Sequence, residues 1–565
     1  MKIKSLLIGM LASVALVGCT NTDEPEVNNG NENESAGKAY VSVKLVMTNA
    51  NGSRAVKEHG FAVGETTEKT ISTAADKSIF LFYDKDGKWV TSGQIVNGNV
   101  NTENKVDGDH KDLVNDLSGE VYVVLNGPDQ SLTKVEKVLT VVNYNGADKL
   151  KNLNLNQALN VITNAQENNP ASTKDLGFLM STSVYYNNGE VNVTAINPKT
   201  QICTTQEDAK LNPVKIYIER ASAKFQINWE DSYAVEADGE TTDEDKNEDT
   251  EETEDDVVVD GELKEATIEI LGYTLNNYNT TTNLVKDITG FNEDSNKPFD
   301  GWNFATNFRS YWAKGTQYNY DPTKDECPLE VHTFTEASNT DEKISYVYEH
   351  TVATPNVVAN RATEVAQPNV TTVLIAAKFS VPDYTGSFYK YGGVFYKETS
   401  YLNLISKQLA DAGYFVQDAT DDKKYNHIPA SSFTISKVDN QLAKVQVTVN
   451  SGEYYKVDGT TATKVSDIAP MQNIVNSLSY VKEIEAYKEG KCFYQIPIEH
   501  LGEKYGVVRN HWYKMNINAV KHIGKAVYNE TVEIPQIPAK DTEHYLAAEI
   551  HVLSWHVVEQ DVTLE

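Results

Sequence analysis

The sequence predicts a mainly β chain of two β-sandwich domains with a few inserted helices. Short segments in which apolar and polar residues alternate recur along most of the chain, and turn residues separate them. This is the pattern of half-buried strands. The 565 residues are too many for one hydrophobic core and suit two or three domains. Strands of this kind with few helices between them favour sandwiches.

The first 18 residues have the pattern of an export signal. Lys2 and Lys4 precede an apolar run over residues 6–17, which is too short to span a membrane as a helix. The sequence Leu-Val-Gly-Cys that ends at Cys19 resembles a bacterial lipobox. It implies cleavage before Cys19 and acylation of that residue, with an ordinary secretory signal as the alternative. The polar stretch that follows is too poor in apolar residues to fold, and we interpret it as a tether.

The first predicted strand covers residues 38–48. Its residues alternate strictly in polarity, as expected for a strand with one face on a core. The apolar face would carry Val41, Val43, Leu45 and Met47.

Further strands and four helical stretches follow along the chain. Alternation predicts strands around residues 78–90, with a hairpin turn at Asp86-Gly87, and at 119–127 and 213–229. Six more alternating segments lie between residue 266 and the C-terminus. Apolar spacing predicts helices near residues 132–142, 147–165, 401–413 and 471–484.

Residues 236–256 form a strongly acidic run, with thirteen carboxylates against one lysine. Such a block repels itself and rarely packs. We interpret residues 233–262 as a solvated linker between an N-terminal sandwich over 55–232 and a C-terminal sandwich over 263–547. Loose Ca²⁺ binding is the alternative, although the spacing lacks the pattern of an EF-hand.

The composition argues against several classes of function. A net charge of −31 would repel nucleic acid and anionic membranes. The eleven histidines are scattered, and no metal-site, nucleophile-elbow or phosphate-loop motif is present. We therefore expect no catalytic residues, no metal and no cofactor, and we expect that the chain is not an enzyme. Cys203, Cys327 and Cys492 have no metal-ligand spacing, so they allow either one disulfide or buried free thiols.

One arginine stands out in the N-terminal region. Arg54 lies in a loop rich in Gly, Ser and Asn just after the first strand, and the next arginine is Arg220. Exposed loops of small polar residues are where proteases cut, whereas Arg220 falls within a predicted strand. We therefore interpret the loop as a cut site.

These features together resemble the type V pilins of Bacteroidia, the fimbrillins. The resemblance rests on the lipobox, the tether, the first strand and the lone arginine. It also rests on four segments: VYVVLNG, IYIERASAKFQI, GVVRNHWYKMNINAVKHIG and EIHVLSWHVVEQDVTLE. The acidic run is a departure from the family pattern and leaves the domain boundary open.

The resemblance implies transthyretin-like sandwiches and a function as a structural shaft subunit of fimbriae. An arginine-specific protease would cut between Arg54 and Ala55, so that residues 19–54 are a propeptide. Loss of the strand over 38–48 would open a groove for residues 548–565 of another copy. The apolar residues expected in this donor strand are Ile550, Val552, Trp555, Val557, Val562 and Leu564.

The implied partners are other copies of the chain, accessory, tip and anchor subunits of the fimbria, and the protease. The precursor would reach the outer membrane as a lipoprotein, and the mature form would lie on the cell surface in fimbriae. Two alternatives remain from the sequence: a surface-anchored glycan- or protein-binding lipoprotein, and a tip or accessory subunit. A tip subunit would accept a strand and donate none, whereas this chain ends in a long alternating segment.

Overall fold

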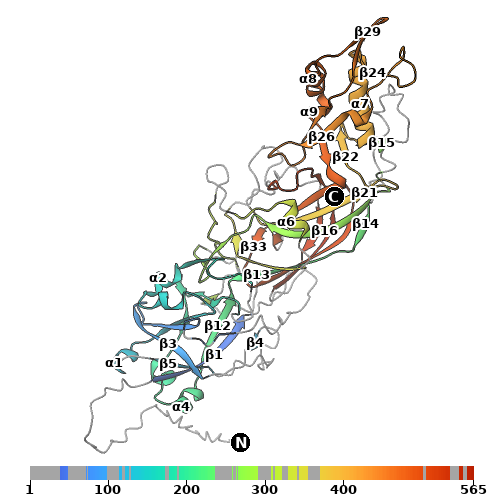
Figure 1. Ribbon diagram of the computed structural model, residues 1–565. Coiled ribbons are helices and arrows are strands. Elements are labelled where there is room, and N and C mark those ends of the chain that lie inside the picture. Colours follow the sequence, from blue (N-terminus) through green and yellow to red (C-terminus); the bar gives the residue numbers. More distant parts are fainter. Residues whose placement is uncertain are drawn as a thin grey trace, which may run out of the picture. The chain divides into compact units, whose positions relative to one another are not determined.

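The structure is a computed structural model (Figure 1). It describes residues 39–48, 71–97 except 73 and 75, 114–116, 121–125, 129–171, 177–187, 190–235, 257–258, 263, 265–290, 307–308, 312–320, 329–339, 343–353, 370–500, 504–534, 546–550 and 556–564. Within these residues, contacts define two compact units. Unit 1 extends to Ala221 and also includes Asn283–Tyr311, while unit 2 comprises Ser222–Thr282 and the chain from Trp312 onward.

Unit 1 is built on one nine-stranded sheet that closes on itself. The strands follow the order β11-β6-β2-β3-β5-β1-β12-β8, β4 pairs with β1, and β6 also pairs with β8. The sheet thereby encloses a core as the two faces of a sandwich do. Its strands are β1 (Ala39–Thr48), β2 (Ile79–Tyr83), β3 (Trp89–Asn97), β4 (Val114–Asp116), β5 (Val121–Leu125), β6 (Lys137–Val142), β8 (Met180–Thr182), β11 (Thr194–Ala195) and β12 (Val214–Arg220).

Short elements complete unit 1. The helices are α1 (Asp129–Leu132), η2 (Ala147–Leu150), α2 (Leu155–Leu159), α3 (Pro198–Gln201) and α4 (Gln206–Leu211). A three-stranded sheet contains β9 (Tyr185–Asn187), β10 (Glu190–Asn192) and β18 (Asn307–Phe308), and β7 covers Ile162–Asn164. Helix α4 begins at Thr205, whose hydroxyl accepts a hydrogen bond from the Asp208 amide at 3.1 Å, as favoured at a helix start.

Unit 2 is a β-sandwich of two five-stranded sheets. One sheet has the order β19-β13-β34-β37-β36 and the other β14-β16-β21-β31-β35. Phe225, Tyr513 and Met515 from the first sheet and Ile268 and Ile375 from the second belong to one buried cluster. The strands are β13 (Ser222–Asn228), β14 (Ser232–Ala234), β16 (Thr267–Asn276), β19 (Ile344–Tyr348), β21 (Thr372–Ser380), β31 (Lys491–Pro497), β34 (His511–Val520), β35 (Lys525–Ala526), β36 (Leu546–Ile550) and β37 (His556–Leu564).

Residues 381–490, which we call the insertion, lie between two adjacent strands of the sandwich. Strands β21 and β31 pair with each other directly, so the insertion is not needed to connect them in space. Its helices are α7 (Glu398–Asp411), η5 (Ala430–Ser432), α8 (Ala469–Ser477), α9 (Ser479–Lys482) and η6 (Lys488–Gly490). Its strands are β22 (Phe388–Tyr391), β23 (Val394–Lys397), β24 (Tyr414–Gln417), β25 (Tyr425–Asn426), β26 (Phe433–Lys437), β27 (Val445–Val449), β28 (Tyr455–Asp458), β29 (Thr461–Lys464) and β30 (Glu485–Tyr487).

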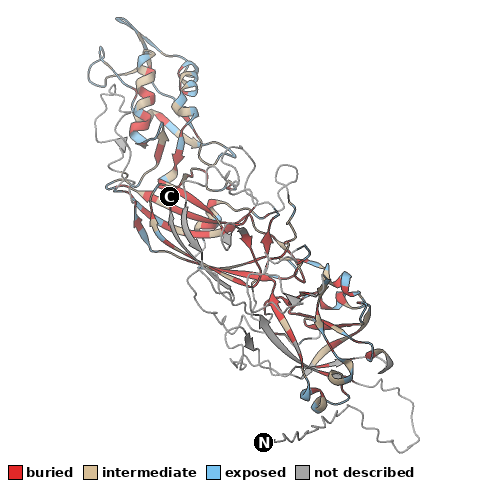
Figure 2. Ribbon diagram, turned by 180° about the vertical axis from the view of Figure 1, so that it is seen from behind, coloured by how far each residue is buried: buried red, intermediate tan, exposed pale blue. Residues whose placement is uncertain are grey.

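The remaining elements of unit 2 are short. They are β15 (Val257–Val258), which pairs with β23, and β20 (His350–Thr351), β32 (Glu499–His500), β33 (Lys504–Val507) and α6 (Phe334–Ser338). Strand β17 (Thr281–Asn283) spans the division, because Asn283 belongs to unit 1. Figure 2 shows buried residues along the strands of both units. The predicted mainly β fold with a few helices is therefore confirmed.

Two of the four predicted helices are confirmed and two are not. Helix α7 covers the stretch predicted at 401–413, and α8 with α9 covers the stretch at 471–484. The helix predicted at 132–142 is wrong, because α1 ends at Leu132 and β6 occupies Lys137–Val142. Five of the six residues of β6 are buried, so its apolar run reflects a strand buried on both faces. The stretch at 147–165 holds only η2, α2 and β7, and Asn152 interrupts it with φ +67°.

The division into units differs from the predicted linker at 233–262. The units meet in sequence between Ala221 and Ser222, where β12 ends and β13 soon begins. Strand β14, which precedes the acidic run, pairs with β16, which follows it. The run 236–256, which lies outside the described residues, therefore connects paired strands of one unit. Only Ala221 separates β12 from β13, so there is no loop of distinctive composition that could have marked the division in the sequence.

Cys203 and Cys492 are both buried, and Cys492 is a free thiol. Burial raises the pKa of the Cys492 thiol to about 12, which keeps it protonated and unreactive. Cys327 lies outside the described residues. Among the helices that the structure describes, none is long and apolar enough to cross a membrane.

Candidate assembly site

The first described strand, β1, lies in the interior of the sheet of unit 1. On one side it pairs in parallel with β12, and on the other it pairs antiparallel with β5 and β4. The register places Val43, Leu45 and Met47 opposite Val214, Ile216 and Ile218, and Val41 opposite Val123. The predicted strand is therefore confirmed, with both edges paired.

The residues around β1 belong to the core. Val41 is fully buried and Ala39 is 6% exposed. Their neighbours Val123, Ile216 and Ile218 are also fully buried. Removing β1 would separate β5 from β12 and uncover these apolar side chains, together with unpaired backbone groups on two strands.

A single covalent connection joins β1 to the rest of the described structure. The next described strand is β2 at Ile79, and the chain between them contains Arg54 and Ala55. Both residues lie outside the described part, as does Cys19. A cut anywhere in this connection would leave β1 attached only through noncovalent contacts. The position of Arg54 in the sequence between β1 and β2 is therefore what release of β1 by a protease requires.

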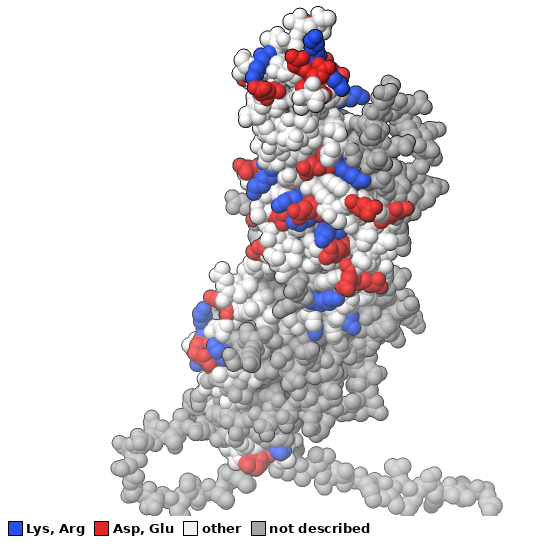
Figure 3. Space-filling view, turned by 45° about the vertical axis from the view of Figure 1, so that its right-hand side comes forward, with Lys and Arg blue, Asp and Glu red and all other residues white. Residues whose placement is uncertain are grey.

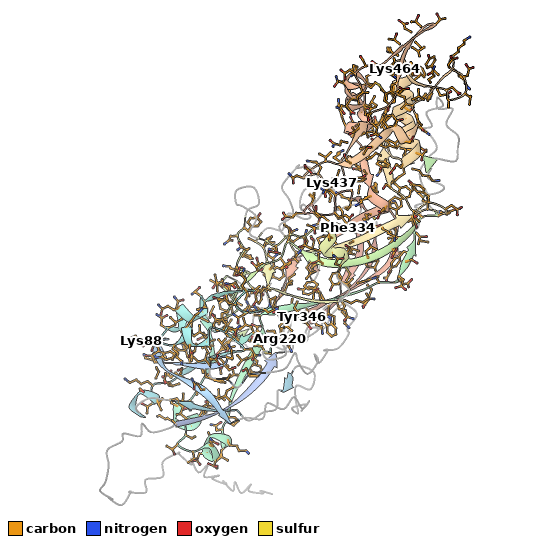
Figure 4. All side chains as sticks on the ribbon, in the orientation of Figure 1. Lys88, Arg220, Phe334, Tyr346, Lys437 and Lys464 are labelled. Carbon is orange, nitrogen blue, oxygen red and sulfur yellow. The ribbon has the colours of Figure 1, made fainter. Side chains whose placement is uncertain are left out.

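The arginines of the chain differ in how a protease could reach them. The sequence has five, at positions 54, 220, 309, 361 and 509. Arg220 ends β12 with 3% exposure and Arg509 is fully buried, and Figure 4 labels Arg220 within unit 1. These two positions are closed to a protease in the folded chain, while the other three lie outside the described residues.

The last two strands occupy the other candidate region, at the end of a sheet in unit 2. Strand β37 pairs in parallel with β34, and β36 pairs antiparallel with β37. In the described strand order, β36 is the final strand. Sequence reasoning predicted one donor strand over 548–565. The structure instead has two strands, with residues 551–555 between them outside the described part.

The register of β37 shows which of the predicted donor residues lie level with buried residues of β34. Val562 and Leu564 lie level with Ile517 and Val520, which are buried in the sandwich core. Val558 lies level with the buried Tyr513, and Val557 is the residue before it. Ile550 ends β36, whereas Val552 and Trp555 lie outside the described residues.

A buried corner built by the VVRNHWY segment holds β34 in place. Asn510, with φ +60°, turns the chain into β34, and its amide donates to the Ser222 carbonyl at 2.7 Å. The Val508 amide donates to the Tyr513 hydroxyl at 2.8 Å, and burial raises the pKa of this tyrosine far above its ordinary value. The corner therefore ties β34 to β13, and β34 is the strand on which β37 lies.

The same corner contains a buried ion pair that sequence reasoning missed. Arg509 Nε lies 3.1 Å from Glu349 Oε2, and both side chains are at most 1% exposed. The Arg509 Nη2 group also donates to the Thr282 hydroxyl at 3.3 Å. Glu349 directly follows the alternating strand β19. A carboxylate at the buried end of such a strand is the signal that could have found it.

Outside these regions, the described residues offer little for catalysis. No group of three or more His, Cys, Asp or Glu side chains among them is placed to hold a metal ion. A cavity of about 560 Å³ in unit 1 is lined by three lysines, three carboxylates and three asparagines, together with a few other residues. Its three lysines and three carboxylates balance in formal charge, and its lining includes no histidine, cysteine or serine.

The comparisons with known proteins identify the C-terminal part of the chain. The family model described as major fimbrial subunit protein type IV, fimbrillin, C-terminal, matches residues 485–561. Over this C-terminal region the chain is similar to the fimbrillins. The matched region contains β34, the VVRNHWY corner, β36 and most of β37. The similarity therefore falls on the last two strands and on the elements that support them.

Solved structures similar to this chain include two fimbrial proteins. The tip fimbrial protein Mfa3 from Porphyromonas gingivalis is 12% identical, with a TM-score of 0.22, and the match covers 62% of this chain and 85% of that one. A fimbrial assembly protein from Parabacteroides distasonis is 13% identical, with a TM-score of 0.24, and the match covers 76% of this chain and 100% of that one. The search of curated proteins found no match.

Proposed function

We propose that this chain is a structural shaft subunit of cell-surface fimbriae that polymerises by protease-gated strand exchange. The observation that carries the proposal is the place of β1, an interior strand at the N-terminal side of unit 1. The family match to fimbrial subunits supports the same function. A strand in this position blocks assembly while present and leaves an acceptor groove once removed.

The precursor would be delivered as a lipoprotein through Cys19 and stored with β1 in its own groove. An arginine-specific protease then cuts between Arg54 and Ala55. This cut separates the lipid anchor and β1 from the folded chain in one step. The released subunit carries an open groove between β5 and β12, which is a template for another strand.

The donor in this proposal is the C-terminal segment 548–565 of a neighbouring copy. To donate, it must leave β34 of its own unit 2 and enter the groove of the next subunit by strand addition. Four or five apolar side chains at about 1.5–3 kcal/mol each would contribute roughly 6–15 kcal/mol before the cost of association. Because donor and groove are different surfaces of one chain, the contact does not close and a filament follows.

The test compares arginine variants of the full-length precursor exposed to a protease that cuts only after arginine. Arg54→Ala should remain an uncut, folded and lipid-anchored monomer, seen by mass spectrometry and electron microscopy. Arg309→Ala and Arg361→Ala are matched controls and should still be cut near residue 54 and form filaments. A chain that ends at Gln536 should be cut but should not extend a filament. Ordinary fimbriae from uncut Arg54→Ala protein would contradict the proposal.

The lipid step is tested separately. Cys19→Ala should lose acylation and fail to reach the surface, which labelling with a palmitate analogue measures. Unchanged labelling of this variant would contradict the lipoprotein step. Strand exchange would then be tested only by the Arg54 variants.

A further inference from the structure

The insertion has a hydrophobic core of its own. Tyr389, Leu402, Ile405, Val447 and Met471 belong to a buried cluster distinct from the cluster of the sandwich. Figure 1 shows α7, α8, β24 and β29 together at the end of the insertion away from β16 and β21. Because β21 and β31 already pair, this second core does not serve the sandwich sheet. A segment that is folded but not needed for the framework is a candidate for recognition.

The composition of the insertion differs from that of the whole chain. It contains eleven of the 31 tyrosines within 110 residues. It carries eleven lysines against thirteen carboxylates, a net charge of −2, whereas the whole chain has −31. Figure 3 shows basic and acidic side chains intermixed on the visible face of this part. The insertion is therefore a tyrosine-rich part of an acidic protein, and its own net charge is close to zero.

A small four-stranded sheet in the insertion places aromatic residues on one face. Its order is β25-β24-β28-β29. Tyr414 and Val416 pack against the core of the insertion, so Phe415 and Gln417 occupy the other face. The register puts Tyr455 opposite Phe415 and Tyr425 opposite Gln417. We call the set Phe415, Gln417, Tyr425, His427 and Tyr455 the aromatic face.

The rings of the aromatic face contact one another and remain accessible. The Tyr425 and Tyr455 ring centroids lie 5.4 Å apart, and those of Phe415 and His427 lie 6.2 Å apart. His427 is exposed, and the other four residues are half-buried. Lys464, labelled in Figure 4, lies level with Tyr455 and forms an ion pair with Glu453. The charges next to the rings are thereby balanced.

Hydrogen bonds fix the aromatic face before anything binds. The Tyr455 hydroxyl donates to Gln417 Oε1 at 3.2 Å, and Gln417 Nε2 donates to the Asp422 carbonyl at 2.7 Å. The Asp418 carboxylate closes the adjoining loop by accepting from Asn426 Nδ2 and from the Thr420 hydroxyl, both at 2.7 Å. These bonds lower the pKa of Asp418 well below its ordinary value. A fixed surface loses little conformational entropy on binding.

We propose that the aromatic face binds uncharged oligosaccharides. Sugar rings present flat C–H faces and polar hydroxyl rims, and the aromatic face offers flat rings beside amide, hydroxyl and imidazole groups. The balanced charge favours a neutral ligand over an anionic one. The strands are only two to four residues long, so the face is small for a stable protein interface, which buries more than about 1,000 Å².

This inference goes beyond the proposed assembly function and does not depend on it. Strand exchange uses β1 and the C-terminal segment, whereas the aromatic face lies in the insertion. A protein that fails to polymerise would still bind sugar through this face.

The experiment uses the full chain on a printed panel of neutral oligosaccharides of hexoses and N-acetylhexosamines, with sialylated and sulfated counterparts. Bound sugars are then titrated calorimetrically. Tyr425→Ala and Tyr455→Ala should each weaken binding about tenfold, since removing a central aromatic contact commonly costs more than 1 kcal/mol. Tyr455→Phe keeps the ring and should retain most of the affinity. Tyr318→Ala, a half-buried tyrosine of unit 2 outside the insertion, is the matched control and should bind as wild type.

Melting temperatures of all variants are measured to separate binding from folding. Loss of sugar binding with an unchanged melting temperature supports the proposal. Three results would overturn it: no neutral sugar bound by the wild type, binding only to the anionic counterparts, or neutral-sugar binding that survives the double substitution Tyr425→Ala with Tyr455→Ala.

Discussion

The two ends of the described chain are both strands, but they lie in sheets in different ways. Strand β1 is paired along both edges within a closed sheet, while β36 is the last strand in the order of an open one and β37 follows it inward. Withdrawing β1 exposes two strand edges and a fully buried core. Withdrawing β36 and β37 exposes one edge, that of β34.

In the proposed strand exchange, this difference favours the place of β1 as the acceptor and the C-terminal strands as the donor. A gap between two strands can bind an added strand from both sides, so the place of β1 is the stronger acceptor. A strand at the end of an open sheet has fewer hydrogen bonds to break before it leaves, so the C-terminal pair is the better donor. The two ends suit these two different steps because β1 is paired along both edges, whereas β36 is the last strand in its sheet order.

Removing β1 is expected to have the largest effect. A chain that begins at Ala55 should lose roughly 6–15 kcal/mol of gross burial in unit 1. Calorimetry should show a lost or strongly lowered unit 1 transition, with fast hydrogen exchange in β5 and β12. The matched control ends at Gln536 and should lower only the unit 2 transition. Equal losses from both truncations would break the comparison between the two ends.

Breaking the buried ion pair should come next and should affect unit 2 only. Arg509→Leu leaves Glu349 charged and uncompensated, which typically costs about 3–5 kcal/mol. Urea unfolding monitored by unit-specific hydrogen exchange measures the loss. Lys378→Ala is the control, because its pair with Glu269 is 41% and 51% exposed and should contribute less than about 1 kcal/mol. A loss spread over both units would argue against separate stabilities.

His350 should make unit 2 sensitive to acid. Burial lowers its pKa to about 4, and its Nδ1 lies 2.9 Å from the Thr371 hydroxyl. The unfolded chain binds this proton at about pH 6.5, so the contribution to stability is complete above pH 6.5 and is lost as the pH falls toward 4. The loss is roughly 3 kcal/mol. In His350→Asn, the unit 2 transition should fall less steeply over this pH range. Identical slopes in both proteins would contradict it.

Single substitutions in β37 should have a smaller effect on the stability of unit 2. Val562→Ala should destabilise unit 2 by about 1.5 kcal/mol, because Val562 lies level with the buried Ile517. Val557→Ala, one residue out of step, should change it by less than about 0.5 kcal/mol. Chemical denaturation of the two variants side by side measures the difference. A larger loss for Val557→Ala would mean that the strand has the opposite phase.

The acidic run should matter least. Deleting residues 236–256 shortens a connection between the paired strands β14 and β16, so the melting temperature should change by only a few degrees, as expected where no core is touched. Scanning calorimetry with and without Ca²⁺ measures this. A large loss, or a Ca²⁺-dependent shift that disappears on deletion, would favour an ion site instead.

The sequence predicted strands correctly where polar and apolar residues alternate strictly. The strand over residues 38–48 was predicted from the strict alternation of its residues, and Val41 on the predicted apolar face is fully buried. The pairing of β1 with β12 and β5 was not predictable, because a strand pattern does not identify its partners. The same holds for Glu349 and Arg509, which are 160 residues apart.

Errors arose where a local pattern had two interpretations. Val138, Val141 and Val142 have helical spacing but lie in a strand buried on both faces. The acidic run suggested a boundary through its composition, while the actual division at Ala221 has no compositional mark. The aromatic face was not predicted, because Phe415, Tyr425 and Tyr455 come together only through the register of three short strands.

The single residue between β12 and β13 has a mechanical consequence. Ala221 is the only residue between a strand of unit 1 and a strand of unit 2, and it is 1% exposed. In a filament built as proposed, tension entering β12 from an exchanged strand beside it passes along the covalent backbone directly into β13. No slack segment is present at this joint to unravel under load. We expect such a fimbria to stretch little in flowing liquid until an entire strand slips from its groove.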